Sequence, residues 1–125
     1  MAFWLVRHAQ PLDAAGRCYG RLDLAACPTA TASAAQALAQ VLPPQVPVYT
    51  SPLQRCEQLA LALQALRPDL PYKIEPRLQE LDFGRWEGLP WSAVPRAELD
   101  AWAADLAHYR PGGGEALAAM LVRVQ

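Results

Sequence analysis

The sequence lacks the features on which metal-binding, nucleic-acid-binding and membrane proteins depend. Its three cysteines, Cys18, Cys27 and Cys56, are odd in number and match no metal-ligand spacing, which predicts reduced thiols and no metal site. Eleven basic against twelve acidic residues leave a net charge of −1 without a basic stripe, so nucleic acid is not expected as a partner. The apolar N-terminal run is too short to span a membrane and meets Arg7 without a signal-peptide cleavage pattern, so we expect a cytoplasmic protein and no membrane contact.

The pattern of apolar residues predicts an α/β fold. At 125 residues the chain fits one domain over residues 1–125, and its twelve prolines predict short elements. Apolar runs predict strands at Phe3–Val6, Val46–Tyr49 and Tyr72–Glu75, the first of them buried on both faces. Helical spacing predicts helices over Thr29–Leu42, Ser51–Leu66, Pro95–His108 and from Leu117 onward. This order of elements predicts a sandwich with a largely parallel sheet.

Two of these helices carry sharper expectations. In the first, the spacing of four apolar residues predicts an inward face made of Ala34, Ala37, Leu38 and Val41. In the second, Ser51 is expected at the N-cap, Pro52 at the first helical position and Gln54 as the partner in a capping box. That helix would therefore begin directly after a strand.

Three segments combine residue types that suit phosphate chemistry. Arg7 and His8 follow the first predicted strand, and ligands of α/β folds bind at the ends of strands. An arginine there can clamp a phosphate, and a neutral histidine can act as nucleophile or proton carrier. Arg55 lies in the first turn of a helix whose free amides favour an anion, although a solvated surface arginine is the alternative. The third segment, Leu78–Gly88, is rich in carboxylates and aromatics, and its alternative is a solvated acidic loop.

Together these segments resemble the histidine phosphatase family, also called phosphoglycerate mutase-like. Leu5-Val6-Arg7-His8-Ala9 resembles the opening signature of that family, which usually reads Arg-His-Gly. Tyr49-Thr50-Ser51-Pro52-Leu53-Gln54-Arg55 resembles its S-P-L-x-R segment, and the loop that ends in Phe83-Gly84-Arg85-Trp86-Glu87-Gly88 resembles its E-x-x-F-G-x-W-E-G loop. Gly113-Gly114-Glu115 is similar to the family's glycine-glycine-glutamate. Residues 18–24 resemble a loop of small bacterial phosphatases that act on α-ribazole phosphate.

The resemblance implies a three-layer α/β/α sandwich and a phosphomonoesterase that needs no cofactor and no metal. It makes His8 the nucleophile that accepts a phosphoryl group from a small phosphorylated metabolite, with Arg7 and Arg55 holding the phosphate oxygens. Glu80 would protonate the leaving oxygen, and Asp82 is the rival for that role. A neutral His8 needs an acceptor for its other ring nitrogen, such as a backbone carbonyl. A protonated Glu80 would be favoured by partial burial or by the charge of a bound phosphate.

Two further positions carry weaker expectations. Gly20 would allow the backbone to approach a phosphate, or would simply make a turn. Arg21 would meet an anionic substrate. Inorganic phosphate is the expected product, and self-association or strand exchange between copies is left open.

The chain also departs from the family pattern. Ala9 replaces the usual glycine, and the family's second catalytic histidine, which follows a later strand, has no counterpart. The chain contains only His8 and His108, and His108 lies far from the expected motif. That later strand would lie beside the first one, in the middle of the sheet, so the fold reads as truncated at its C-terminal end. We therefore expect the 125 residues to be part of a longer polypeptide, or to receive a strand from another chain.

Three functions remain open from the sequence. The first is hydrolysis of a phosphomonoester through a phosphohistidine. The second is a phosphoglycerate mutase, which would return the phosphoryl group to a bound product. The third is a phosphate-binding pseudoenzyme or a partner-binding fragment without turnover, which the missing histidine favours. A metal-dependent phosphatase is not expected, because no histidine or carboxylate cluster has ligand spacing.

Overall fold

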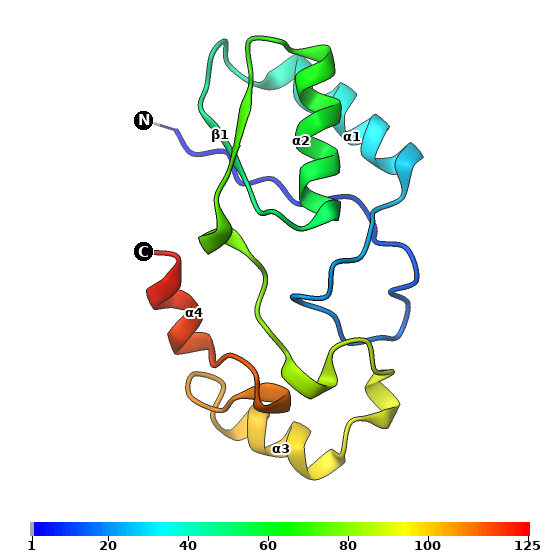
Figure 1. Ribbon diagram of the computed structural model, residues 1–125, viewed down its shortest axis with the longest axis vertical. Helices are drawn as coiled ribbons and strands as arrows, with labels where there is room; N and C mark the ends of the chain where they lie inside the picture. The colour runs from blue at the N-terminus through cyan, green and yellow to red at the C-terminus, as the bar shows by residue number, and fades with distance from the viewer. Residues whose placement is uncertain (1) are drawn as a thin grey trace. The chain divides into compact units, whose positions relative to one another are not determined.

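A computed structural model describes residues 2–125 of the chain (Figure 1). The contacts within it define two compact units. The first contains the residues up to Leu12 together with Leu24–Pro76. The second contains Asp13–Asp23 together with Arg77–Gln125. Each unit has its own set of secondary-structure elements.

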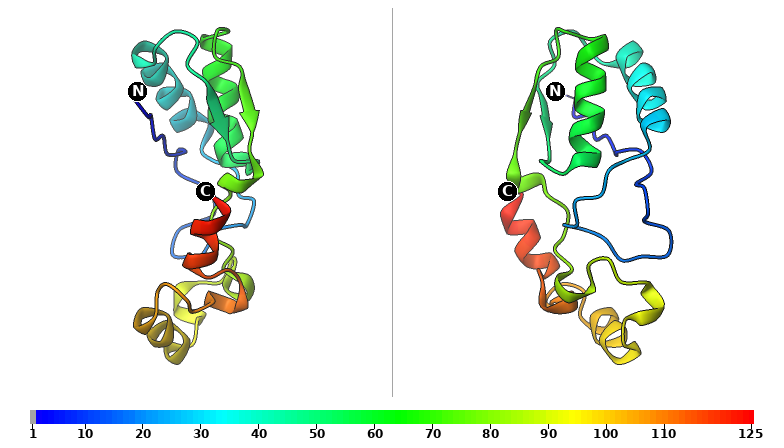
Figure 2. Two further views of the ribbon diagram at one scale, coloured as in Figure 1. Left: turned by 90° about the vertical axis from the view of Figure 1, so that its left-hand side faces the viewer. Right: turned by 45° about the vertical axis from the view of Figure 1, so that its right-hand side comes forward.

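The first unit is built around a parallel pair of strands. β1 (Val48–Thr50) and β2 (Tyr72–Ile74) pair in register, with Val48 opposite Tyr72 and Thr50 opposite Ile74. The connection between them is α2 (Gln54–Leu66), which packs against both strands. Figure 2 shows α2 lying between the strands and α1 (Pro28–Val41). The predicted α/β class and parallel pairing are confirmed, and the helices of this unit pack on one face of the pair.

The buried face of α1 differs by one position from the predicted one. Thr31 and Ala35 are buried in the helix, and Leu42 directly after it joins Leu63 and Leu70 in the core. Of the predicted inward face, Leu38 packs against this core as expected, whereas Ala37 and Val41 are exposed. Alanines lie on every side of this helix, so the apolar pattern alone fixes its orientation poorly. The larger leucine side chain decides it, because burying leucine contributes more free energy than burying alanine.

The start of α2 also differs from the prediction. Its N-cap is Leu53, and no side chain caps the helix. The Ser51 hydroxyl oxygen accepts a hydrogen bond from the backbone N–H of Leu53 at 3.2 Å. Ser51 and Pro52 therefore form a turn that precedes the helix, because a serine side chain can satisfy an amide two residues on in such a turn. The prediction of Ser51 as the N-cap and Pro52 as the first helical residue is wrong.

The segment Phe3–Val6 is not a strand, contrary to the prediction. Phe3 is 85% exposed and Leu5 is 97% exposed, so the segment is not buried on either face. An apolar run makes a strand only where a second strand accepts its backbone hydrogen bonds. Within residues 2–125, β1 and β2 form a sheet of two strands and neither pairs with this segment. The chain that follows this segment pairs at Pro11, which makes an isolated antiparallel bridge to Ala26.

The second unit consists of turns, loops and two short helices. α3 (Arg96–Ala104) ends four residues before the predicted limit, because Asp105 leaves the helical conformation and its carboxylate accepts the backbone N–H of His108 at 3.2 Å. α4 (Leu117–Arg123) follows a glycine-rich turn at Pro111–Gly113. The loop predicted from Leu78 is confirmed, with one 3-10 turn at Gly84–Trp86 inside it.

Aromatic rings form the core of the second unit. Cys18, Trp86 and Val94 are buried there, and Phe83 and Trp102 pack against them. The Trp86 and Trp102 rings meet edge to face with centroids 5.6 Å apart, and Phe83 meets Trp102 in the same way at 5.8 Å. Gly112 closes the turn over these rings with a φ of +62°, where a side chain would meet the Phe83 carbonyl. The aromatic cluster thus holds the second half of the carboxylate-rich loop, from Phe83 to Trp86.

Candidate active site

His8 is half-buried in the first unit and has a defined hydrogen bond. Its Nδ1 lies 2.7 Å from the carbonyl oxygen of Ala9. A carbonyl oxygen can only accept, so Nδ1 is the donor in this contact, and in the neutral imidazole that donates there Nε2 has a lone pair. This is the arrangement expected for a nucleophilic imidazole, in which the other nitrogen is held by a backbone carbonyl. Arg7, directly before it, is exposed.

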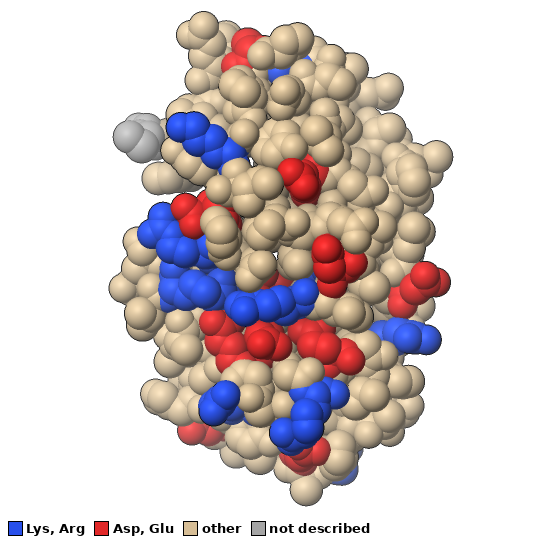
Figure 3. Space-filling model, viewed as in Figure 1, with Lys and Arg blue, Asp and Glu red and all other residues tan. Residues whose placement is uncertain are grey.

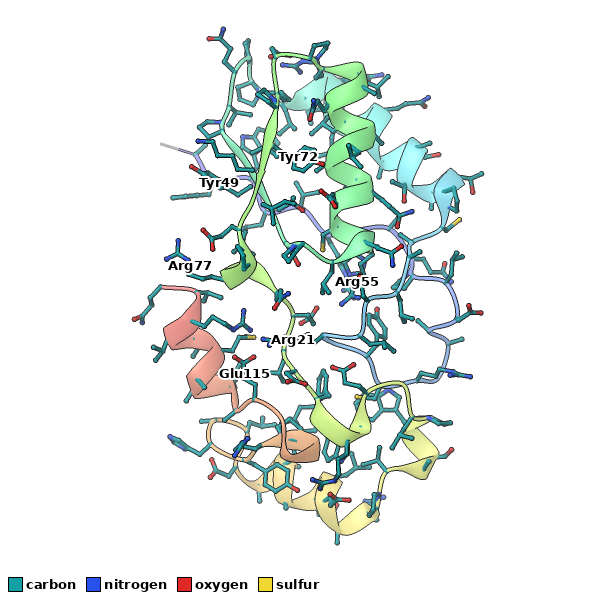
Figure 4. All side chains as sticks on the ribbon, viewed as in Figure 1. Arg21, Tyr49, Arg55, Tyr72, Arg77 and Glu115 are labelled. Carbon is teal, nitrogen blue, oxygen red and sulfur yellow. The ribbon has the colours of Figure 1, made fainter. Side chains whose placement is uncertain are left out.

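Arg55 lies in the first turn of α2, where the chain enters the helix from β1 (Figure 4). Its side chain is only 1% exposed, so the alternative of a solvated surface arginine is wrong. Burying a guanidinium costs several kcal/mol unless hydrogen bonds or an opposite charge compensate it. An arginine buried at the positive end of a helix lies where the helix dipole favours an anion.

Glu87 organises the loop of the second unit that carries Gly20 and Arg21. Its carboxylate accepts three backbone N–H groups of that loop, from Gly20 at 3.0 Å, Arg21 at 2.8 Å and Leu22 at 3.2 Å. It also accepts the N–H of Phe83 at 3.0 Å. One carboxylate therefore joins the loop to the segment that follows Glu80. Hydrogen bonds to an ionised acceptor are among the stronger ones in proteins.

Gly20 is buried against the same segment. A side chain at this position would meet the Leu81 carbonyl oxygen and the ring of Phe83. Its φ is not in the left-handed region, so glycine is needed here for close approach and not for an unusual turn.

Arg21 lines a cavity of about 390 Å³ in the second unit. Its Nη2 lies 3.7 Å from Oε1 of Glu115, and Figure 4 shows the two side chains near each other. Asp82 and Arg110 also contribute charged groups to the lining, together with the backbone of Gly113 and Gly114. Figure 3 shows that basic and acidic side chains are intermixed on the face of the molecule that is drawn there. The cavity therefore offers both donors and acceptors to a polar ligand.

The two candidate acids differ in their surroundings. Glu80 is exposed, so the expected partial burial of its side chain is not found. Asp82 is half-buried, and its Oδ1 accepts the backbone N–H of Gly84 at 2.9 Å. Its backbone carbonyl accepts the N–H of Glu115 at 2.7 Å. Asp82 is thus engaged in the local turn, which leaves Glu80 as the more available carboxyl group.

The remaining polar groups show no metal centre. Among residues 2–125, no three His, Cys, Asp or Glu side chains come together in a way that would hold a metal ion. His108 lies at the surface, where its Nδ1 is 3.3 Å from Oδ1 of Asp105. No helix in the described part of the chain has the length and apolar character needed to cross a membrane.

Comparison with protein families gives a match over nearly the whole chain. The model of the histidine phosphatase superfamily (branch 1) matches residues 3–125. The chain belongs to this superfamily. No curated protein sequence matches it.

Solved structures agree with this assignment. The structure described as mycobacterial hydrolase 1 is 29% identical, with a TM-score of 0.77 over 94% of this chain and 58% of that one. A mycobacterial glucosyl-3-phosphoglycerate phosphatase in complex with inorganic phosphate is 26% identical, with a TM-score of 0.78 over 94% of this chain and 56% of that one. The protein TTHB049 from Thermus thermophilus is 29% identical, with a TM-score of 0.73 over 94% of this chain and 65% of that one. These matches confirm the predicted phosphoglycerate mutase-like fold, and the chain spans less than two thirds of each of these structures.

The histidine phosphatase motifs are distributed over both units. Arg7, His8 and Arg55 belong to the first unit, whereas Glu80, Gly20 and Arg21 belong to the second. Sequence reasoning missed two residues of the second unit, Glu87 and Arg123. Glu87 could have been found from its place between two glycines in a loop, where a carboxylate can accept several backbone amides. Arg123 gave no such signal, because its partners are far from it in sequence.

Proposed function

We propose that the chain is a phosphomonoester hydrolase that works through a phosphohistidine on His8. The hydrogen bond from His8 Nδ1 to the Ala9 carbonyl carries this proposal, because it leaves Nε2 free to attack phosphorus. Arg7 and Arg55 hold the phosphate oxygens, and Glu80 is the general acid. The match of the histidine phosphatase model to residues 3–125 supports this assignment.

The first step transfers the phosphoryl group to the protein. The lone pair on His8 Nε2 forms a bond to phosphorus while the bond from phosphorus to the ester oxygen breaks. The departing alkoxide takes the proton of the Glu80 carboxyl group and leaves as an alcohol. The arginines neutralise the charge on the equatorial oxygens, which is the main requirement of phosphoryl transfer.

The second step releases phosphate. Water attacks the phosphorus of the phosphohistidine, the P–N bond breaks, and the pair of electrons returns to Nε2. The Glu80 carboxylate takes the proton of the attacking water and is ready for the next cycle. Two steps with lower barriers thus replace one difficult hydrolysis.

The relatives support a small phosphorylated substrate. One structural neighbour is a glucosyl-3-phosphoglycerate phosphatase, and its structure holds inorganic phosphate. The Gly20–Arg21 loop contributes to a polar cavity that suits the remainder of such a substrate.

The test is hydrolysis of an aryl phosphate by the protein and by its His8→Ala variant. We expect the wild-type protein to release inorganic phosphate and the variant to release none above the uncatalysed rate. A phosphoprotein trapped from radioactive substrate should be labile in acid and stable in base, as expected of a phosphohistidine. The proposal is wrong if phosphate release persists in His8→Ala.

The same assay separates the two other candidate functions. Transfer of the phosphoryl group to a bound phosphoglycerate in preference to water would identify a mutase. Binding of inorganic phosphate without any turnover would identify a pseudoenzyme. Exchange of His8 for asparagine provides a control, because it keeps an amide N–H donor near the position of Nδ1 and removes the nucleophile.

A further inference from the structure

Arg123 forms hydrogen bonds that connect Glu115 to the segment preceding Glu80. It is the last residue of α4, and its side chain is only 19% exposed. Its Nε and Nη2 donate to the two carboxylate oxygens of Glu115, each at 2.8 Å, in a bidentate pair. Its Nη1 donates to the backbone carbonyls of Arg77 at 2.6 Å and Gln79 at 2.9 Å. All three guanidinium nitrogens are therefore engaged.

The residues held in this way lead directly to Glu80. The 3-10 turn Pro76–Leu78 ends two residues before it, and Glu80 itself lies outside any helix or strand. The bond to the Gln79 carbonyl fixes the peptide group that Gln79 shares with Glu80. The hydrogen bond to Glu115 raises the pKa of Arg123, and the charges of Glu115 and Glu80 add to this effect against the cost of burial. Arg123 is thus a cation whose charge is balanced chiefly by Glu115.

The same network reaches Arg21. Glu115 accepts the guanidinium of Arg123, and its Oε1 also lies 3.7 Å from Nη2 of Arg21. The hydrogen bond and charge of Arg123, together with the charge of Arg21, hold the pKa of Glu115 below its usual range. An ionised Glu115 therefore lies between two arginines, one next to the proposed general acid and one on the lining of the cavity.

We propose that Arg123 is the positioning residue for the general acid Glu80. This role rests on the function proposed above. Glu80 is exposed on irregular backbone, so its side chain lacks the packing that usually locks a catalytic group in place. Arg123 supplies that restraint through the backbone on one side, and the Glu87 carboxylate supplies it on the other through the N–H of Phe83. A misplacement of about 1 Å in such a group can lower a rate on the order of a hundredfold.

The kinetic test compares esters that need a general acid with esters that do not. Arg123→Gln should lower kcat/KM, which reports only the transfer of the phosphoryl group to His8, by about ten- to a hundredfold for an alkyl phosphate, because the alkoxide must be protonated as it leaves. For dinitrophenyl phosphate, whose phenolate leaves without a proton, kcat/KM should stay within about threefold. Arg123→Lys keeps the charge without the planar fork and should restore part of the alkyl rate.

Arg96→Gln is the matched control. It removes an exposed arginine of the same unit that pairs with Asp100, and both esters should react at the wild-type rate. Equal losses for both esters in Arg123→Gln would mean that Arg123 only supports the fold. An unchanged alkyl rate would also overturn the proposed role.

A second measurement keeps the test independent of the proposed activity. The amide nitrogens of Leu78 and Glu80 belong to the peptide groups whose carbonyls Arg123 binds, so their NMR resonances report these hydrogen bonds. Arg123→Gln, or Arg123→Lys if the first variant is unfolded, should shift and broaden both resonances, whereas Arg96→Gln should not. If the wild-type protein hydrolyses neither ester, the proposed function fails. Unshifted resonances in a folded variant would show that Arg123 does not hold this segment.

Discussion

At the scale of single residues, Cys18 and Cys27 have different surroundings, which give their thiols different pKa values. Cys18 is fully buried, and desolvation raises its pKa to about 12, with a smaller contribution from the charge of Glu87. Cys27 is half-buried next to the start of α1. Its hydrogen bond to the Thr29 hydroxyl, 3.2 Å long, lowers its pKa, and the backbone N–H of Ala30 adds to this. The thiolate is the nucleophilic form, so reactivity should follow these shifts.

We expect Cys27 to react with a thiol-modifying reagent at pH 7 to 8 and Cys18 to remain unmodified until the protein unfolds. The folded-state pKa of Cys18 lies above this pH range and that of Cys27 lies below its ordinary value, so Cys27 should have the larger thiolate fraction throughout this range. Mass spectrometry of the modified peptides measures the reactivity of each thiol, and Cys27→Ser provides the control. Rapid modification of Cys18 in the folded protein would contradict the prediction.

The surroundings of single residues also explain which residues of the candidate site could be predicted from the sequence. The Arg7-His8 pair and Arg55 are visible because they lie in recognisable sequence motifs, and Arg55 also lies at a helix start. The Ala9 carbonyl could be anticipated only as one acceptor among several. Arg123 could not be found, because its role depends on contacts with Arg77 and Gln79, more than forty positions earlier in the sequence.

At the scale of elements, one arginine joins the ends of α1 and α2. Arg67 directly follows α2, and its Nη1 donates to the carbonyls of Ala39 at 2.8 Å and Leu42 at 3.0 Å. These carbonyls at the end of α1 lack helical partners, so the guanidinium caps that helix and meets the negative end of its dipole. Asp69 holds the guanidinium with two bonds of 2.8 Å and accepts the N–H of Gln45 at 3.0 Å.

This arrangement makes the stability of the first unit depend on pH. The hydrogen bond from Arg67 holds the pKa of Asp69 well below its usual range, with a further contribution from the N–H of Gln45. A depressed carboxyl pKa stabilises the folded state at pH values above the unfolded-state pKa of about 4. The contribution is lost as the pH falls from there toward the folded-state pKa.

We therefore expect Asp69→Asn to lower the melting temperature of the protein at pH 7, and the difference from the wild type to shrink progressively as the pH falls from 4 toward 2. Thermal unfolding followed by circular dichroism across this range measures the difference. Asp100→Asn is the matched control, because Asp100 makes an exposed ion pair with Arg96 that should contribute little at any pH. A loss of stability in Asp69→Asn that is the same at every pH would contradict the linkage.

The elements also show where sequence patterns reach their limit. Helix boundaries follow from local signals such as the prolines after Leu42, and α1 and β2 lie within a residue of their predicted limits. The face that a helix buries depends on what packs against it, so the predicted face of the alanine-rich α1 is one position away from the observed one. A strand depends on a partner, so the apolar run Phe3–Val6 is exposed where its pattern predicts a buried strand. Local sequence signals therefore predict where the helices lie. Contacts between residues far apart in the sequence decide which helix face is buried and whether an apolar run forms a strand.

At the scale of the whole molecule, the exposed apolar residues are of two kinds. Some lie in a segment outside any strand or helix, and others lie in a helix. Phe3 and Leu5 belong to an extended segment outside any strand of the described chain, so both their side chains and their backbone groups face solvent. Val122 is 70% exposed but lies in α4, where the helix satisfies the backbone. Extended apolar backbone without a partner pairs readily with another strand, whereas an exposed helical side chain does not.

We expect the 125-residue chain to self-associate through Phe3–Val6. In sedimentation velocity, the mass should rise above the 13.7 kDa of one chain as the protein concentration increases from micromolar to hundreds of micromolar. The double variant Phe3→Ser, Leu5→Ser should stay closer to one chain, because it removes the apolar contribution to pairing. Val122→Ser should associate like the wild type. A monomer at every concentration would contradict the prediction, and an equal effect of Val122→Ser would mean that association follows total apolar exposure and not the unpaired extended segment.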